Sequence, residues 1–249
     1  MIYYYLTVLI FGLVIGSFLN VVIWRIPRDE SISFPPSHCP KCNNHIRPYD
    51  LIPVISYIIL GGRCRYCKEK ISIEYPIVEL INGIMYVFLF YKFPMSLKAI
   101  EYSFLFSLLL SISIIDFKTQ LVDDKMILFG GAGVLVFELI NKGFSMKLLD
   151  NLYGALTGAV VIGLIVYLTR GMGEGDIEIF ALCGFVLGFK YTLLSLWLSF
   201  ILGGIIGVTL LLLKIKKRKD PIAFGPYIAL GSMIVLLYGD SLIRLVFYR

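Results

Sequence analysis

The chain has 249 residues, of which 58% are hydrophobic and 16% charged, and its mean hydropathy is +0.85. This composition excludes a water-soluble fold, because average soluble domains carry about 25% charged residues. The net charge of +6 is compatible with nucleic-acid binding, but the sequence has no nucleic-acid motif and no basic face with interleaved aromatic residues. We therefore predict an all-α polytopic membrane protein that does not bind nucleic acid.

Apolar stretches that are long enough to cross a bilayer recur along the chain. A hydrocarbon core about 30 Å thick needs roughly 20 apolar residues per helix. The first stretch has no basic segment at its start and no small-residue cleavage site before Arg25, so we expect a retained helix and not a removed signal peptide. We predict eight transmembrane helices, at residues 2–24, 77–92, 97–115, 126–141, 152–169, 177–190, 192–213 and 224–243.

The distribution of basic residues predicts the topology. Eight spans place both termini on the same side of the membrane. If the termini lie outside, the cytoplasmic loops hold most of the 23 Lys and Arg residues, as the positive-inside rule requires. We therefore expect three parts: a first transmembrane helix at 1–24, a cytoplasmic loop at 25–76 and a membrane-embedded domain at 77–249.

Two Cys-x-x-Cys pairs lie in the cytoplasmic loop. The first is Cys39 with Cys42 and the second is Cys64 with Cys67, and 21 residues separate the pairs. This spacing is typical of zinc ribbons. Four thiolates complete a tetrahedral shell around Zn²⁺ and leave no position for water, so we predict a structural zinc site. Disulfides or redox dithiols are the alternative, and a reducing cytoplasm disfavours them.

Other residues near the cysteine pairs have less specific interpretations. His38 and His45 are alternative zinc ligands, although four cysteines suffice. Segment 50–62 is too short and too interrupted to span the membrane, so we expect it at the membrane interface or packed on the cysteine pairs. Cys183 lies alone in an apolar stretch and is interpreted as a packing residue.

Two carboxylates lie at the ends of predicted spans. Asp116 ends the third apolar stretch, and Asp176 ends a glycine-rich turn before the sixth. Acidic side chains are costly in a bilayer and usually mark function. If the two meet, one ionised and one protonated carboxyl group can activate water and polarise a carbonyl, which is peptide hydrolysis without a covalent intermediate. The structural alternatives are that Asp116 marks a helix end and that Asp176 is a helix N-cap.

Neighbouring residues extend this candidate site. Asp123 and Asp124 follow Asp116 closely enough to share its face on a continuous helix, so either is a rival to it. Gly173 and Gly175, with Gly171 before them, are expected to allow positive φ and close approach of a substrate strand, although an ordinary turn also uses glycine.

Several short blocks occur in one order along most of the chain. The blocks are Gly16–Arg25, the paired cysteines around Asp50–Pro53, Tyr75–Leu80, Ile114–Asp116, Gly173–Asp176 and Phe224–Tyr227. Their residue types and order resemble those of the bacterial type IV prepilin leader peptidases, which are aspartic membrane proteases of the GxGD type.

The resemblance implies an activity and its residues. Asp116 and Asp176 match the two catalytic aspartates, and Asp124 matches a further family aspartate. The family cleaves a short basic leader, after a glycine, from type IV prepilins or type II secretion pseudopilins at the cytoplasmic face of the bacterial inner membrane. Many members then methylate the new N-terminus with S-adenosylmethionine. No glycine-rich dinucleotide-type motif locates that donor here, so Glu79 and the cysteine loop are candidates by position alone.

The chain departs from the family pattern at two positions. Asp123 stands where a proline is common, and Glu178 stands where a lysine is frequent. Both changes add negative charge near Asp116 and Asp176, and we expect an acidic mouth that attracts a basic leader. The alternative is ordinary solvated loop charge.

Two rival functions are compatible with part of the pattern. A transporter or channel that binds a cation or proton at Asp116 and Asp176 explains the carboxylates but not the cysteines. A membrane methyltransferase or assembly factor without protease activity predicts that both aspartates tolerate substitution.

Overall fold

The computed structural model describes residues 1–142, 146–169, 171–217 and 222–247. Throughout these ranges the regular secondary structure is helical, which confirms the prediction of an all-α protein. The gaps all fall in the predicted membrane domain 77–249, which is therefore described only in part.

Eight long helices and three short ones occur in the described ranges. The short ones lie in the loop after the first long helix: the 3₁₀ turns η1 (Ile26–Arg28) and η2 (Pro48–Leu51) and the helix α2 (Ile55–Ile59). The long ones are α1 (Ile2–Arg25), α3 (Glu74–Lys92), α4 (Leu97–Thr119), α5 (Asp124–Lys142), α6 (Met146–Thr169), α7 (Glu174–Leu187), α8 (Phe189–Leu212) and α9 (Gly225–Phe247).

Each predicted span coincides with one long helix, but not all of these helices have the length and apolarity of a membrane span. In the described part of the chain five have both, namely α1, α4, α6, α8 and α9. Helix α7 has 14 residues, which is about 21 Å of helix and shorter than a typical hydrocarbon core. The structure therefore supports a helical membrane protein, and the eight crossings stay a prediction.

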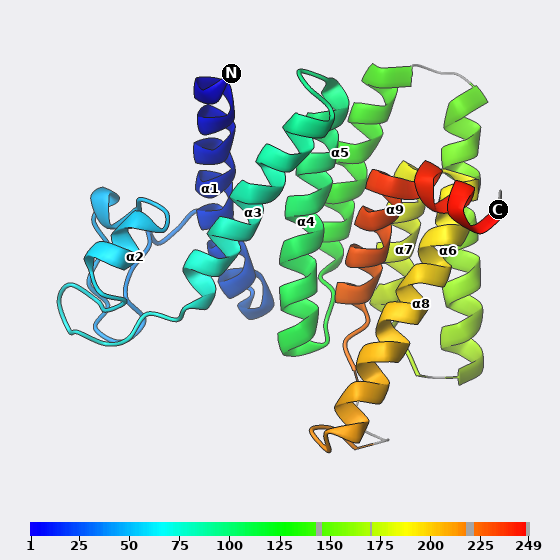
Figure 1. Cartoon of the computed structure of the whole chain (residues 1–249). Helices are drawn as coiled ribbons and strands as arrows, with labels where there is room; N and C mark the ends of the chain where they lie inside the picture. The colour runs from blue at the N-terminus through cyan, green and yellow to red at the C-terminus, as the bar shows by residue number, and fades with distance from the viewer. Residues whose placement is uncertain (143–145, 170, 218–221, 248–249) are drawn as a thin grey trace. The chain divides into compact units, whose positions relative to one another are not determined.

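By its packing the chain divides into two compact units, Met1–Ser107 and Leu108–Arg249. The division falls inside α4, whereas the sequence analysis placed boundaries at residues 24 and 76. In the first unit α1 lies along α3, and the loop with α2 lies beside them (Figure 1). Close approach of these two helices requires glycine, because a Cβ on Gly16 would lie 2.7 Å from the Cα of Glu79.

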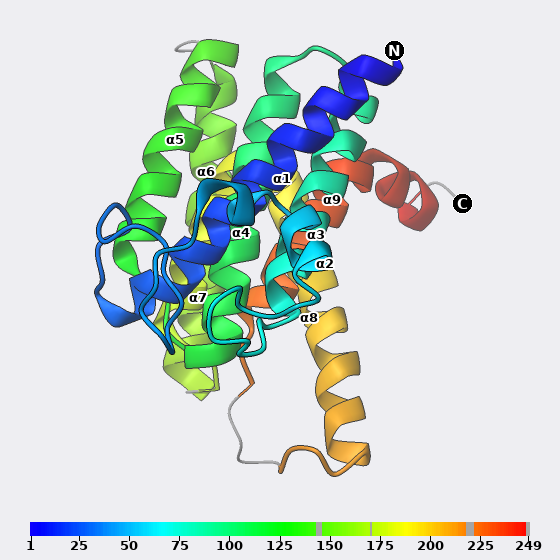
Figure 2. The same ribbon diagram turned by 90° about the vertical axis from the view of Figure 1, so that its left-hand side faces the viewer.

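In the second unit α7 packs against α5, α6, α8 and α9, and α8 packs against α6 and α9. Gly188, with a φ of 75°, joins α7 directly to α8. The predicted boundary at residues 190–192 is therefore wrong by about three residues, because a single glycine in the left-handed region makes the turn. The C-terminal end of α8 extends away from the other helices of this unit (Figure 2).

Candidate active site and metal centre

Asp116 lies near the C-terminal end of α4 and is buried, with 6% of its surface exposed. Its Oδ2 accepts a hydrogen bond of 2.8 Å from the backbone N–H of Gly225, the first residue of α9. A Cβ at position 225 would lie 2.7 Å from the same oxygen, so the contact requires glycine. The positive end of the α9 dipole thus faces this carboxylate.

Asp176 is the third residue of α7 and is also buried, with 5% exposed. Its Oδ2 accepts a hydrogen bond of 3.1 Å from the backbone N–H of Gly173, in the manner of the acidic member of a capping box. The sequence-based alternative, in which Asp176 is the N-cap, is wrong: α7 begins at Glu174, and Gly173 is the N-cap.

Both side chains lie in the second unit. The carboxylate of Asp176 lies within electrostatic range of Asp116. Each has one oxygen bonded to a backbone N–H, from Gly225 and Gly173 respectively. Two buried carboxyl groups whose charges interact are not readily ionised at the same time. That arrangement is chemically able to activate a water molecule for attack on a carbonyl.

Of the glycines before Asp176, Gly175 is required by packing, and none of them has a positive φ. Among the described residues the glycines with positive φ are Gly61, Gly62 and Gly188. The prediction that residues 171, 173 and 175 take positive φ is therefore wrong. Gly175 is needed because its Cβ would lie 2.5 Å from Cβ of Val122, in the connection between α4 and α5.

Asp123 and Asp124 are not on a continuous helix with Asp116, because α4 ends at Thr119 and α5 begins at Asp124. The Oδ1 of Asp123 accepts hydrogen bonds from the backbone N–H groups of residues 125 and 126, at 2.9 and 3.3 Å, so this residue caps α5. Asp124 is exposed. The interpretation of either residue as a rival to Asp116 is therefore not supported by the geometry.

Substitution of Glu178 tests the predicted acidic mouth. It lies on α7, within electrostatic range of Asp124. Glu178→Lys is expected to lower kcat/KM for a substrate with a basic leader by about tenfold at low salt, with a smaller loss at high salt, because salt screens attraction between exposed charges. The kcat/KM of Glu178→Gln should lie between those of the unaltered protein and Glu178→Lys. A loss independent of salt concentration would contradict the acidic mouth.

The two cysteine pairs form matching turns. In the first, the N–H of Asn43 donates to the carbonyl of Cys39, and in the second the N–H of Lys68 donates to the carbonyl of Cys64. Asn43 and Lys68 occupy the same place in each turn and have φ values of 56° and 60°. Each turn thus presents its two thiols from the same backbone shape.

Their sulfur atoms meet at one point. The Sγ atoms of Cys39, Cys42, Cys64 and Cys67 all lie within 4.8 Å of one another, and those of Cys39 and Cys67 are 3.8 Å apart. Sulfurs at about 2.3 Å from a tetrahedrally coordinated zinc ion are about 3.8 Å apart. Donor type, donor number and spacing therefore fit a single metal ion.

The remaining metal-binding candidates lie outside this cluster. The group of possible ligands formed by described residues contains the four cysteines and neither histidine. His38 and His45 instead pair through their backbones on either side of the first turn. Cys183 is buried in α7, as expected for a packing residue.

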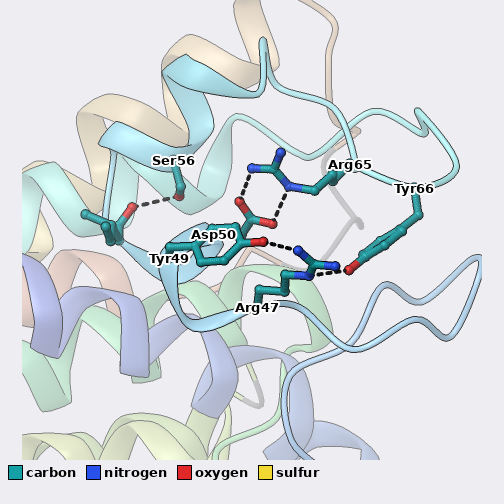
Figure 3. Close-up of polar contacts among 7 residues, drawn as sticks. Arg47, Tyr49, Asp50, Ser56, Arg65 and Tyr66 are labelled. Carbon is teal, nitrogen blue, oxygen red and sulfur yellow. Dashed lines mark hydrogen bonds and ion pairs between the residues drawn. The ribbon is translucent and has the colours of Figure 1, made fainter.

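Polar side chains connect the two turns (Figure 3). The guanidinium of Arg65 donates two hydrogen bonds to Asp50, at 2.8 and 2.6 Å, and holds the pKa of that carboxyl below its usual range. The Nε of Arg47 donates to the hydroxyl of Tyr66 at 3.0 Å, and Arg47 also donates to Tyr49. The segment that follows the first cysteine turn is thus hydrogen-bonded to the second cysteine turn.

A cavity of about 620 Å³ lies in the first unit, lined by α1, α3 and the cysteine loop. Its polar lining includes Glu79, Asp50 and Arg65, and its aromatic lining includes Tyr57 and Tyr75. Pockets for small molecules usually measure about 300 to 1,000 Å³ and combine apolar walls with a few polar groups. The sequence analysis gave Glu79 and the cysteine loop as candidates for binding the methyl donor by their position alone, and it did not predict a cavity.

Glu79, which lines this cavity, is hydrogen-bonded to a residue with a strained backbone. Its side chain is buried, and Oε2 accepts a hydrogen bond of 2.7 Å from the N–H of Val54. Val54 has φ 62° and ψ −50°, which is unfavourable for a β-branched residue. Such strain persists where the surroundings enforce it, often at functional sites.

One contact of the site was not predicted from the sequence, namely the hydrogen bond from Gly225 to Asp116. A backbone donor has no sequence signature of its own. The available signal was the block Phe224–Tyr227, which the resemblance noted without assigning it a role.

Buried paired aspartates, a four-thiol cluster and several apolar helices define a membrane protein with a candidate aspartic peptidase site. Family comparison agrees: residues 10–93 match the Bacterial Peptidase A24 N-terminal domain, and residues 103–208 match the Type IV leader peptidase family. The chain belongs to the type IV leader peptidase family, which confirms the resemblance.

Relatives named prepilin leader peptidase/N-methyltransferase match almost the full chain. The protein from Bacillus subtilis is 34% identical over 239 residues, 94% of each chain. The protein from Pseudomonas aeruginosa is 33% identical in an alignment 270 positions long, which covers 96% of this chain and 92% of the relative. The protein from Neisseria gonorrhoeae is 31% identical, over 95% of this chain and 91% of its own. No solved structure matches the chain.

Proposed function

We propose that this protein removes the short basic leader, after a glycine, from type IV prepilins or pseudopilins and then methylates the new N-terminus. The observation that carries the proposal is the buried pair of Asp116 and Asp176. Full-length similarity to relatives named for both activities supports it.

In this proposal Asp116 and Asp176 act together on one peptide bond. The ionised carboxylate accepts a proton from water, and the protonated one donates to the scissile carbonyl as the water attacks. Collapse of the tetrahedral intermediate returns a proton to the leaving amine, so no covalent intermediate forms. Gly173 supports Asp176 through its N–H. Gly175 keeps the turn against Val122, and Asp124 contributes negative charge.

The metal centre has a structural role in this proposal. Cys39, Cys42, Cys64 and Cys67 would hold Zn²⁺, and four protein ligands leave no position for a reacting water. The loop 26–73 has only short helices, so metal binding would supply much of its folding free energy. Because the loop would fold around its own metal ion, we keep it as a separate part of the chain at residues 25–76, between the first helix at 1–24 and the membrane domain at 77–249.

For the methylation step, the cavity of the first unit is the proposed donor site. S-Adenosylmethionine would supply the methyl group and carries a sulfonium cation, which a buried carboxylate recognises. Glu79 is such a carboxylate and lines the cavity. The cavity volume of about 620 Å³ is within the usual range for a ligand of this size. The cysteine loop forms one wall, so metal removal is expected to impair donor binding.

Glu79→Gln tests this assignment because it removes the charge and keeps the shape of the side chain. We expect methylation to fall at least about tenfold, and donor binding measured by calorimetry to weaken similarly, because a buried charged hydrogen bond contributes about 1.5 to 3 kcal/mol. Glu74→Gln is the matched control, since Glu74 lies on α3 but does not line the cavity. Equal donor binding by the two variants would contradict a role for Glu79.

The membrane arrangement is part of the proposal. We place the protein in the bacterial inner membrane with eight crossings, both termini outside and the cleavage site at the cytoplasmic face. Five apolar helices support a membrane location, and the distribution of Lys and Arg supports the orientation. Accessibility labelling of single cysteines introduced into loops would test it.

The function itself is tested with purified protein, a prepilin and S-adenosylmethionine. Mass spectrometry of the product should show an N-terminus directly after the leader glycine, heavier by one methyl group when the donor is present. A product methylated without cleavage would favour the methyltransferase alternative. If the prepilin is neither cleaved nor methylated and the protein carries ions across liposome membranes, the transporter alternative would be favoured.

A further inference from the structure

We infer that Gly203 and Phe224 are positioning residues for the proposed hydrolysis: they set the backbone N–H of Gly225, which in turn holds the carboxylate of Asp116. This inference deepens the proposed peptidase function and rests on it. Neither positioning side chain needs to contact the substrate. Their effect passes through the backbone at the start of α9.

The start of α9 offers one free backbone donor to Asp116. The N–H of Gly225 points to Asp116 Oδ2 at 2.8 Å. Pro226 has no N–H, and the N–H of Tyr227 already donates to the carbonyl of Phe224 at 2.9 Å. The first N–H groups of a helix have no partner within the helix. The orientation of the residue 225 peptide therefore fixes where Asp116 Oδ2 lies.

Phe224 fixes that peptide from the preceding position. Its ring lies 5.3 Å from the ring of Phe200 and 5.8 Å from the ring of Tyr227, measured between centroids. Aromatic neighbours at such distances pack favourably. With a ring on two sides, the side chain of Phe224 has little freedom to rotate away from a new obstacle.

Gly203 provides the space for this ring on α8. A Cβ at position 203 would lie 2.7 Å from Cε2 of Phe224 and 3.3 Å from Cδ2 of Tyr227. An added methyl group must therefore displace the ring, and with it the residue 225 peptide. The next residue, Gly204, differs in this respect, because a Cβ there meets nothing within 4 Å.

These adjacent glycines provide a matched pair of variants. Both lie in α8, so Gly203→Ala and Gly204→Ala gain the same intrinsic helix propensity. We expect Gly203→Ala to lower kcat for leader cleavage at least about tenfold with KM within about twofold, since a displacement of 1 Å costs about 100-fold. Gly204→Ala should retain the kcat of the unaltered protein.

A second substitution tests the route through Phe224. Because leucine is smaller than phenylalanine, Phe224→Leu should remove the obstacle, so Gly203→Ala should cost less than about twofold in kcat in that background. Such non-additivity is expected of residues in contact. Methylation of a peptide already lacking its leader, which does not use Asp116, should be unchanged in every variant.

The outcomes separate this inference from the proposed function. If the unaltered protein cleaves prepilin and Gly203→Ala matches Gly204→Ala, positioning by Gly203 is wrong. A Gly203→Ala loss that persists with Phe224→Leu, or that comes with lower methylation and a lower unfolding temperature, also overturns it by indicating general misfolding. If the unaltered protein cleaves no prepilin, the proposed function itself fails.

Discussion

Asp116→Asn and Asp176→Asn are each expected to abolish leader cleavage, lowering kcat at least about 1,000-fold. An amide neither accepts a proton from water nor shares one with the opposite carboxyl group, so both acid and base roles fail. Asparagine has nearly the same shape and retains an oxygen that can accept the hydrogen bonds of 2.8 and 3.1 Å from Gly225 and Gly173. The fold should therefore persist, and mass spectrometry of the prepilin product measures the loss.

The control for this experiment is Asp123→Asn. It removes a nearby negative charge, and asparagine caps a helix about as well as aspartate, so α5 should keep its start. At high salt, which screens the attraction between the acidic mouth and a basic leader, this variant should retain most of the cleavage activity. Full cleavage by Asp116→Asn or Asp176→Asn would refute the paired mechanism, and methylation of a leaderless peptide by the same sample would verify that it is folded.

Cys39→Ser and Cys64→Ser are expected to lose the bound metal ion and to unfold the cysteine loop. Serine does not replace a thiolate ligand of zinc, and structural zinc contributes about 10 to 16 kcal/mol to folding of small zinc-finger peptides. Metal analysis of the purified protein should fall from about one ion per chain to near zero. The loop should become protease-sensitive, and binding of S-adenosylmethionine should weaken because the loop lines the cavity.

Cys183→Ala is the control among the five cysteines. Cys183 lies in α7, within the second unit, so its replacement should leave the metal content unchanged. Full metal content in Cys39→Ser would show that the four sulfurs do not form the binding site. Loss of metal without loss of donor binding would instead separate the metal from the cavity.

Apolar runs located every long helix of the described chain, but they misplaced some helix ends. Helix α6 begins at Met146, six residues before the predicted span, because its first turns carry polar side chains with tertiary partners. Asp150 is an example: its Oδ1 accepts a hydrogen bond of 3.4 Å from the N–H of Phe189, at the start of α8. Hydropathy does not reveal a partner so distant in sequence.

Two features made parts of the candidate site predictable from the sequence: the energetic cost of acidic side chains beside apolar stretches, and the regular spacing of metal-binding cysteines. Acids beside apolar stretches identified Asp116 and Asp176, and the Cys-x-x-Cys spacing identified the four thiols. The donor to Asp116 was not predictable, because it is a backbone N–H 109 residues away. The role of Gly175 was also misjudged, since the closeness of Val122 depends on tertiary packing and not on backbone propensity.

The repeated backbone shape of the two cysteine turns has a consequence for how the ion leaves. Each turn supplies two of the four thiols and would contribute half of the coordination shell of a bound zinc ion, so neither half alone would retain the metal against a competing chelator. Release should then proceed in one cooperative step, and partially liganded intermediates should be scarce. A stripped loop would expose neighbouring thiols within each turn, where an oxidant could join them and prevent reloading.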